Sequence, residues 1–268
     1  MNQDYNRHAS LIQSLAHRAI DRATDAPPHR PPPGEQRYAL AAMLPSARVL
    51  LGLSAGADWP TPPTDRPVRF ADGRGHCRWS YRVLAAHLHH RATGQCPPLH
   101  IPEPGGVAAE LWRVWHRLAT GEPADHAVEP IGHRGPADPD PSGGGCLEPR
   151  SPDEPPDHWT YRELVGLHGL QAIIDLVEAR GDPAAPPDAR QRVREITAYH
   201  QRHTQPDYTT YQPWGLAAFV SNPETTWFAE QQLHDVETHL AVEGGGGAVV
   251  AALLLADAYA SLTAAAAR

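Results

Sequence analysis

The stretch WTYRELVGLHGLQAIIDLVEAR, residues 159–180, decides the fold class. Its apolar side chains recur every three or four positions, and this spacing places them on one face of an α-helix: Leu164, Leu167, Leu170, Ile174 and Val177. Gly181 follows at the position where the last turn of a helix favours glycine. The stretch therefore predicts an amphipathic helix that ends at about residue 180.

The same periodicity, read outward from this stretch, predicts helices along most of the chain. Asn222-Pro223-Glu224 is a strong helix start, with an N-capping side chain, a proline in the first turn and an acid after it. Ser80 is a candidate N-cap, and Pro45 predicts a kink or restart. Runs of alternating β-branched residues are almost absent. The expected helices are 8–23, 38–53, 79–91, 107–120, 188–203, 223–242 and 248–265.

One short sequence pattern occurs twice. Trp-Ser-Tyr-Arg at 79–82, followed by Leu84, matches Trp-Thr-Tyr-Arg at 159–162, followed by Leu164. Repeated helix starts are typical of stacked helical hairpins. The predicted fold class is therefore all-α, with hairpins stacked as an α-solenoid or an incomplete α/α toroid. An irregular helical bundle and a chance match remain the alternatives.

A change in composition predicts the domain organisation. Residues 122–158 are rich in Pro, Gly and Asp, which is typical of a linker or a long disordered loop. The prediction is an N-terminal helical region at 1–121, this linker, and a C-terminal helical region at 159–268 that carries the candidate site.

Composition also limits the classes of partner and compartment. The formal net charge of -8 predicts no general attraction to nucleic acid or to an anionic membrane. Cys77, Cys96 and Cys146 are odd in number and lack zinc-site spacing, which favours a reducing compartment. No signal peptide is evident, and the apolar run at 248–256 is short for a membrane span. We therefore expect a cytoplasmic protein with neither nucleic acid nor membrane as partner.

The densest group of aromatic and polar residues lies between two predicted helices, at 205–214. Tyr208, Tyr211 and Trp214 offer flat faces for stacking, and Asp207 accepts hydrogen bonds. These four residues are the candidate ligand-binding set, for a small molecule such as a sugar or for a protein partner. A packed structural loop is the alternative interpretation.

A second set of residues matches the ligand preferences of divalent transition metals. His200 and His203 are three residues apart on one predicted helix, and Asp235 and His239 are four apart on another. If the two helices pack antiparallel, the four side chains converge as candidate ligands for Zn, Mn or Fe, and a bound metal ion would activate water for hydrolysis. An ordinary ion pair between Asp235 and His239 is the alternative.

The pair His234-Asp235, with an upstream histidine and a later Asp257, is similar in outline to the HD-domain phosphohydrolases. The resemblance implies a helical metal-dependent hydrolase. His87 and His90 share a helix face that we interpret as solvated, and His168 is expected at the edge of the core. The sequence thus leaves two functions open: a non-enzymatic binding or scaffold protein that uses residues 205–214, and a metal-dependent hydrolase.

Overall fold

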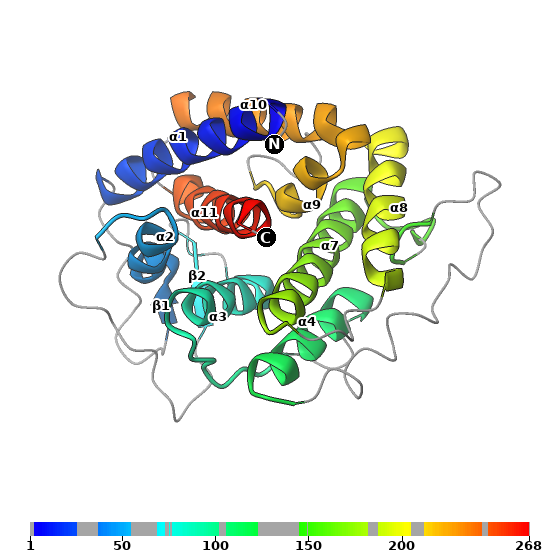
Figure 1. The fold of residues 1–268 in the computed structure, drawn as a ribbon, viewed down its shortest axis with the longest axis horizontal. Coiled ribbons are helices and arrows are strands. Elements are labelled where there is room, and N and C mark those ends of the chain that lie inside the picture. Colours follow the sequence, from blue (N-terminus) through cyan, green and yellow to red (C-terminus); the bar gives the residue numbers. More distant parts are fainter. Residues whose placement is uncertain are drawn as a thin grey trace. The chain divides into compact units, whose positions relative to one another are not determined.

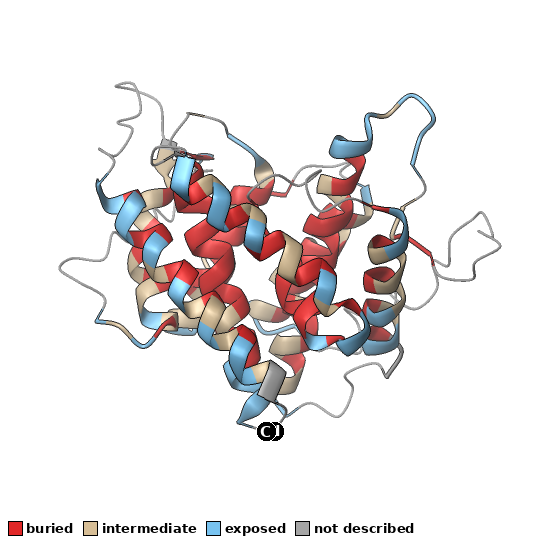
Figure 2. Cartoon of the chain, turned by 90° about the horizontal axis from the view of Figure 1, so that it is seen from above, coloured by how far each residue is buried: buried red, intermediate tan, exposed pale blue. Residues whose placement is uncertain are grey.

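The computed structural model describes residues 3–25, 37–54, 69–72, 75, 77–101, 106–122, 145–148, 150–181, 187–204, 212–242 and 246–267. Within these residues, all elements except one pair of three-residue strands are helical, so the predicted all-α class is confirmed. Stacking of hairpins into a solenoid or toroid remains a prediction. Buried residues form stripes along the helices, as amphipathic helices require (Figure 2).

The chain divides into two compact units. Unit 1 comprises Met1–His100, Tyr211–Pro213 and Gln232–Arg268. Unit 2 comprises Ile101–Thr210 and Trp214–Gln231. Each unit combines segments that are distant in sequence. The predicted division at 122–158 remains a prediction, since residues 123–144 lie outside the described residues.

Unit 1 is built around its C-terminal helix. This helix packs against three others, as Figure 1 shows. The two strands of the unit pair in parallel, with Tyr38 opposite Phe70. The elements are α1 (Gln3–Asp25), β1 (Arg37–Ala39), η1 (Leu40–Met43), α2 (Leu44–Leu50), β2 (Arg69–Ala71), α3 (Trp79–Thr93) and α11 (Gly246–Ala266), together with residues 232–242 of α10 (Thr226–Val242). The C-terminal helix is α11, and its three partners are α1, α2 and α3.

The central helix α11 is apolar on all sides because neighbouring helices surround it. By length and composition, Gly247–Ala266 is apolar enough to cross a membrane, but 78% of its most apolar window is buried inside the protein. That burial is typical of a core helix and compatible with a soluble protein. Asp257, which ends the apolar run in the sequence, is buried within this continuous helix.

Unit 2 depends on a close approach of α4 (Gly106–Ala119) and α7 (Pro156–Ala179). Glycine permits this approach, since a Cβ at Gly169 would stand only 3.1 Å from Nε1 of the Trp112 indole. The same indole donates a hydrogen bond to the Val165 carbonyl at 3.0 Å. Also in the unit are α8 (Pro187–His203), α9 (Leu216–Ser221), η3 (Pro223–Thr225) and residues 226–231 of α10.

The helix ends test the capping predictions. The Asn222 side chain accepts a hydrogen bond from the Glu224 backbone N–H, which confirms the predicted helix start. The prediction for Ser80 is wrong: α3 begins after Arg78, and Ser80 is buried in the first turn. Sequence periodicity does not predict the two three-residue strands or the short helix α9, because α9 has only six residues and therefore little periodicity.

Candidate functional site

The predicted ligand-binding set falls mainly on undescribed positions. Asp207, Tyr208 and Tyr211 lie outside the described residues. Trp214 is described and is fully buried in unit 2, with its ring edge-on to His168 at 5.2 Å and to Tyr161 at 6.2 Å between centroids. A fully buried indole packs the core of its unit and offers no face to an external ligand.

The predicted metal set is divided between the two units. His200 and His203 lie on α8 in unit 2, whereas Asp235 and His239 lie on the part of α10 that belongs to unit 1. His200 is fully buried and His203 is exposed. Convergence of the four side chains therefore stays a prediction.

His200 instead belongs to a buried polar trio that lies entirely in unit 2. Its Nδ1 lies 2.9 Å from Oγ1 of Thr204. Its Nε2 lies 3.6 Å from Oε2 of Glu163 on α7. The exposed fractions are 0% for His200, 3% for Glu163 and 7% for Thr204. The trio therefore joins a hydroxyl, an imidazole and a carboxylate in that order, away from bulk water.

The Glu163 carboxylate is stabilised by backbone groups. Its Oε2 accepts a hydrogen bond from the N–H of Leu147 at 2.6 Å, and its Oε1 accepts one from the N–H of Glu148 at 2.7 Å. Such charge-assisted bonds compensate a buried carboxylate for the hydration it loses. Among the described residues, no ion pair joins Glu163 to an arginine.

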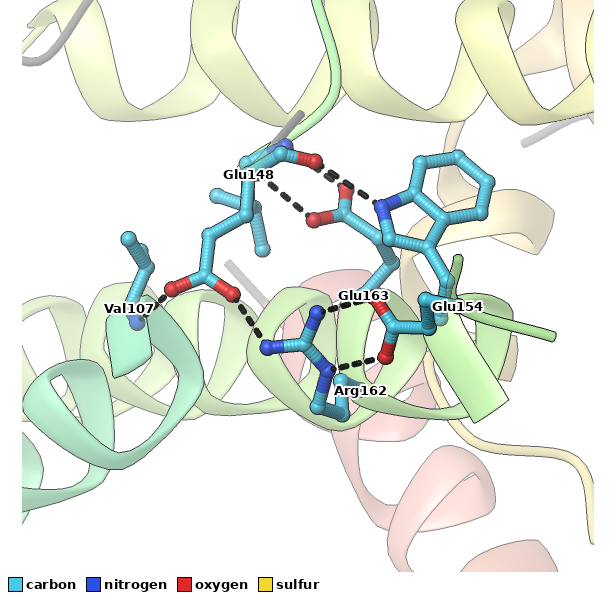
Figure 3. Close-up of polar contacts among 7 residues, drawn as sticks. Val107, Glu148, Glu154, Arg162 and Glu163 are labelled. Atoms are coloured by element: carbon cyan, nitrogen blue, oxygen red, sulfur yellow. Dashed lines mark hydrogen bonds and ion pairs between the residues drawn. The ribbon is translucent and has the colours of Figure 1, made fainter. Parts of the chain in front are cut away.

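The segment that supplies these N–H groups is itself held by side chains, as Figure 3 shows. Nε1 of Trp159 donates to the Glu148 carbonyl at 2.9 Å. Arg162 contacts the Glu148 carboxylate at 2.8 Å and the two carboxylate oxygens of Glu154 at 2.7 and 3.0 Å. Glu148 also accepts a hydrogen bond from the Val107 N–H at the start of α4, where a negative charge is favourable. The backbone donors of Glu163 are thereby fixed in position.

These contacts favour one tautomer of the His200 ring. A carboxylate beside Nε2 favours a proton on that nitrogen, which leaves Nδ1 as an acceptor. Nδ1 then accepts the proton of the Thr204 hydroxyl. The ring is enclosed by apolar surroundings, with the Trp159 and Phe219 rings at centroid distances of 5.8 and 6.5 Å. The trio is thus a hydroxyl hydrogen-bonded to a base that a carboxylate orients.

A second buried histidine–carboxylate pair, formed by His87 and Asp257, lies in unit 1. His87 is 2% exposed and lies on α3 with its Nε2 2.9 Å from Oδ1 of Asp257, so the predicted solvated face is wrong. Arg91, one turn further along α3, contacts the same oxygen at 2.9 Å and Oγ of Ser261 at 2.7 Å. A usable signal was present in the sequence, since a lone carboxylate inside an apolar helix requires a partner.

The chemistry of this His/Asp pair differs from that of the trio. An imidazole nitrogen and a carboxylate oxygen are both donors that a divalent metal ion accepts, so the pair supplies two potential ligands. In unit 1 the Arg91 guanidinium already neutralises the Asp257 charge. His234, part of the resemblance to HD-domain phosphohydrolases, is exposed, and Asp257 pairs with α3. His168, expected at the edge of the core, is buried and accepts a long hydrogen bond, 3.4 Å, from the Gly215 N–H.

Comparisons with protein-family models, with curated proteins and with solved structures find no match to this chain.

Proposed function

We propose that the chain is a binding protein whose recognition segment is residues 205–214. One observation carries the proposal: Thr204, which precedes the segment, and Trp214, its last residue, are both buried in unit 2. Thr204 is held by the His200 ring, and Trp214 is held between the rings of Tyr161 and His168. Fixed ends reduce the conformational entropy that a segment loses when it binds a ligand.

The ligand class follows from the side chains between these ends. Tyr208 and Tyr211 provide aromatic faces, and Asp207 provides a hydrogen-bond acceptor. This combination suits an uncharged ligand with a flat face and hydroxyl groups, such as a sugar. Trp214 serves as an anchor in this proposal, because its ring is fully buried. A protein partner is the other class that the segment suits.

The test is a thermal-shift and intrinsic-fluorescence screen of the full chain against neutral mono- and disaccharides. The proposal expects a saturable shift that Tyr208→Ala or Tyr211→Ala abolishes while helicity is retained. Trp227→Ala is the matched control, since Trp227 is an exposed aromatic residue (53%) elsewhere in unit 2. Sugar binding that survives both tyrosine substitutions would contradict the assigned segment. Loss of helicity in both variants would show a structural loop.

The second candidate is a metal-dependent hydrolase that uses His200, His203, Asp235 and His239 as ligands. The observation in its favour is that the chain buries histidine beside aspartate, as at His87 and Asp257. Metal content of untagged protein purified without chelator tests this candidate. Near-stoichiometric Zn, Mn or Fe that is lost in both His203→Ala and Asp235→Ala would support it, whereas loss only in Asp257→Asn would relocate the metal to unit 1. Metal-free protein, even after loading, would reject it.

A further inference from the structure

We propose that Thr204 is a nucleophile for acyl transfer, with His200 as its general base and Glu163 as the residue that positions His200. This goes beyond the proposed binding function, because recognition by residues 205–214 requires no chemistry. The proposal rests on the trio in unit 2, where a hydroxyl lies within hydrogen-bond reach of a base that a third group orients. That relation is the structural signature of an activated hydroxyl nucleophile.

The Thr204 hydroxyl behaves differently from the other helical threonines. Five of these donate a hydrogen bond at 2.8–3.0 Å to the carbonyl four residues earlier: Thr24, Thr93, Thr120, Thr197 and Thr263. Such back-bonding is the ordinary use of a threonine hydroxyl in a helix. Thr204 also follows a helix, but its hydroxyl contacts the imidazole of the residue four positions earlier. Among the threonines that the structure describes, Thr204 is therefore the one whose hydroxyl contacts a base.

The tautomer of His200 determines which group donates the hydrogen bond between Nδ1 of His200 and the Thr204 hydroxyl. With the proton on Nε2, toward Glu163, the lone pair of Nδ1 points at the Thr204 hydroxyl. The 3.6 Å separation between Nε2 and the Glu163 carboxylate is longer than a hydrogen bond. Contacts of this kind often tighten only when substrate or transition state is bound. When His200 accepts a proton, the nearby carboxylate stabilises the imidazolium.

A metal ion bound by both His200 and Glu163 is a weaker explanation of why these two side chains lie close together. His200 and Glu163 supply two donors, but a zinc site usually needs three or four protein ligands. Within the described residues of unit 2, no third histidine, cysteine or carboxylate ligand atom lies close enough to both to complete a site. Both oxygens of Glu163 already accept backbone N–H bonds.

The proposed reaction is acyl transfer from an ester to water in two steps. The Oγ1–C bond forms as Thr204 attacks the acyl carbonyl, and its proton moves to Nδ1 of His200. The ester C–O bond then breaks, and the departing alcohol takes that proton. In the second step Nδ1 of His200 takes a proton from water, and the resulting hydroxide attacks the acyl carbon. The bond between that carbon and Oγ1 of Thr204 then breaks, His200 returns the proton to Oγ1, and the carboxylic acid leaves. The apolar rings of Trp159 and Phe219 near His200 suit a short, uncharged acyl group.

The experiment uses the full chain and p-nitrophenyl acetate, with p-nitrophenol release followed by absorbance and the acyl-protein detected by intact and peptide mass spectrometry after an acid quench. The chain contains no lysine, so side-chain amines that scavenge activated esters are absent. The proposal expects one acetyl group on Thr204.

The variants separate a chemical role from a structural one. Thr204→Val should abolish acetylation, Thr204→Ser should retain it, and His200→Gln should slow it by roughly 100-fold or more. Thr225→Val is the matched control, because Thr225 is also fully buried in unit 2 but its hydroxyl contacts only backbone carbonyls; it should acylate at the wild-type rate. No acetylation of the wild type, acetylation at another residue, or an unchanged rate in a folded Thr204→Val protein would each overturn the proposal.

Discussion

The two units bury a carboxylate beside a histidine in different ways. In unit 1 Asp257 contacts a guanidinium, a histidine ring and, through Arg91, a serine hydroxyl, so a full positive charge balances its own. In unit 2 Glu163 accepts two backbone N–H groups, and its one ion-pair contact among the described residues is the His200 ring. The arrangement in unit 1 is a fixed ion pair between Arg91 and Asp257. In unit 2 the group beside the carboxylate is the His200 ring, which can accept a proton and pass it on.

The largest expected effect comes from breaking the charge balance in unit 1. Arg91→Ala leaves the Asp257 carboxylate buried without its cation, so we expect the free energy of unfolding to fall by about 3–5 kcal/mol. Urea denaturation followed by circular dichroism measures the change. Arg18→Ala is the control, because Arg18 and Glu237 form a half-exposed pair in the same unit, and it should cost about 1 kcal/mol or less. Equal losses in the two variants would contradict the assignment of a buried ionic cluster.

The second largest loss of stability is expected at the backbone clamp in unit 2, the pair of hydrogen bonds that the Glu163 carboxylate accepts from the N–H groups of Leu147 and Glu148. Glu163→Gln replaces one acceptor oxygen with an NH₂ group that faces a backbone N–H, so a buried donor loses its partner. We expect a loss of about 1.5–3 kcal/mol, since hydrogen bonds to charged groups have this magnitude. The same urea titration tests the loss, with Glu195→Gln as a partly exposed control on α8. If both substitutions have the same small effect, the clamp does not stabilise the fold.

These two sites also mark the limit of what the sequence predicts. Periodic apolar spacing predicts the long helices, because one face of each must be buried. The partners of the buried polar residues are much harder to predict from the sequence, because Glu163 meets residue 147 and Asp257 meets residue 87 only after the chain has folded. His200 was selected from its spacing to His203, yet its described partners are Glu163, on another helix, and Thr204. Pairwise spacing on one helix carries no information about the facing helix.

A smaller effect is expected at the partly exposed edge of the clamp. Arg162 joins Glu148 and Glu154, but 41% of its side chain is exposed, so solvent screens these pairs. Arg162→Ala should therefore cost about 1 kcal/mol or less, and high salt should reduce the difference from wild type. Urea titrations at low and high salt test this expectation. If Arg162→Ala lowers the free energy of unfolding as much as Glu163→Gln does, the exposed ion pairs of Arg162 stabilise this region as much as the buried carboxylate does.

The smallest expected effect concerns pH and unit 1. Burial lowers the pKa of His89 on α3, because a charged ring loses its hydration there. The unfolded chain then binds more protons than the folded chain as pH falls below about 6.5, the ordinary pKa of histidine, so this residue's contribution to stability decreases toward acidic pH. His89→Gln should flatten the stability profile between neutral pH and the lowered pKa. An unchanged slope would show that His89 does not contribute.

The role proposed for Thr204 requires His200 to be the Nε2–H tautomer, with Nδ1 as a base toward the Thr204 hydroxyl. Nitrogen-15 NMR of protein labelled at histidine reports this directly, with His200→Gln identifying the resonances that belong to His200. We expect a protonated Nε2 and an unprotonated, hydrogen-bonded Nδ1, with the Nδ1 shift changing in Thr204→Val. A proton on Nδ1, with Nε2 unprotonated, would rule out His200 as the base, because Nδ1 could then not accept the hydroxyl proton.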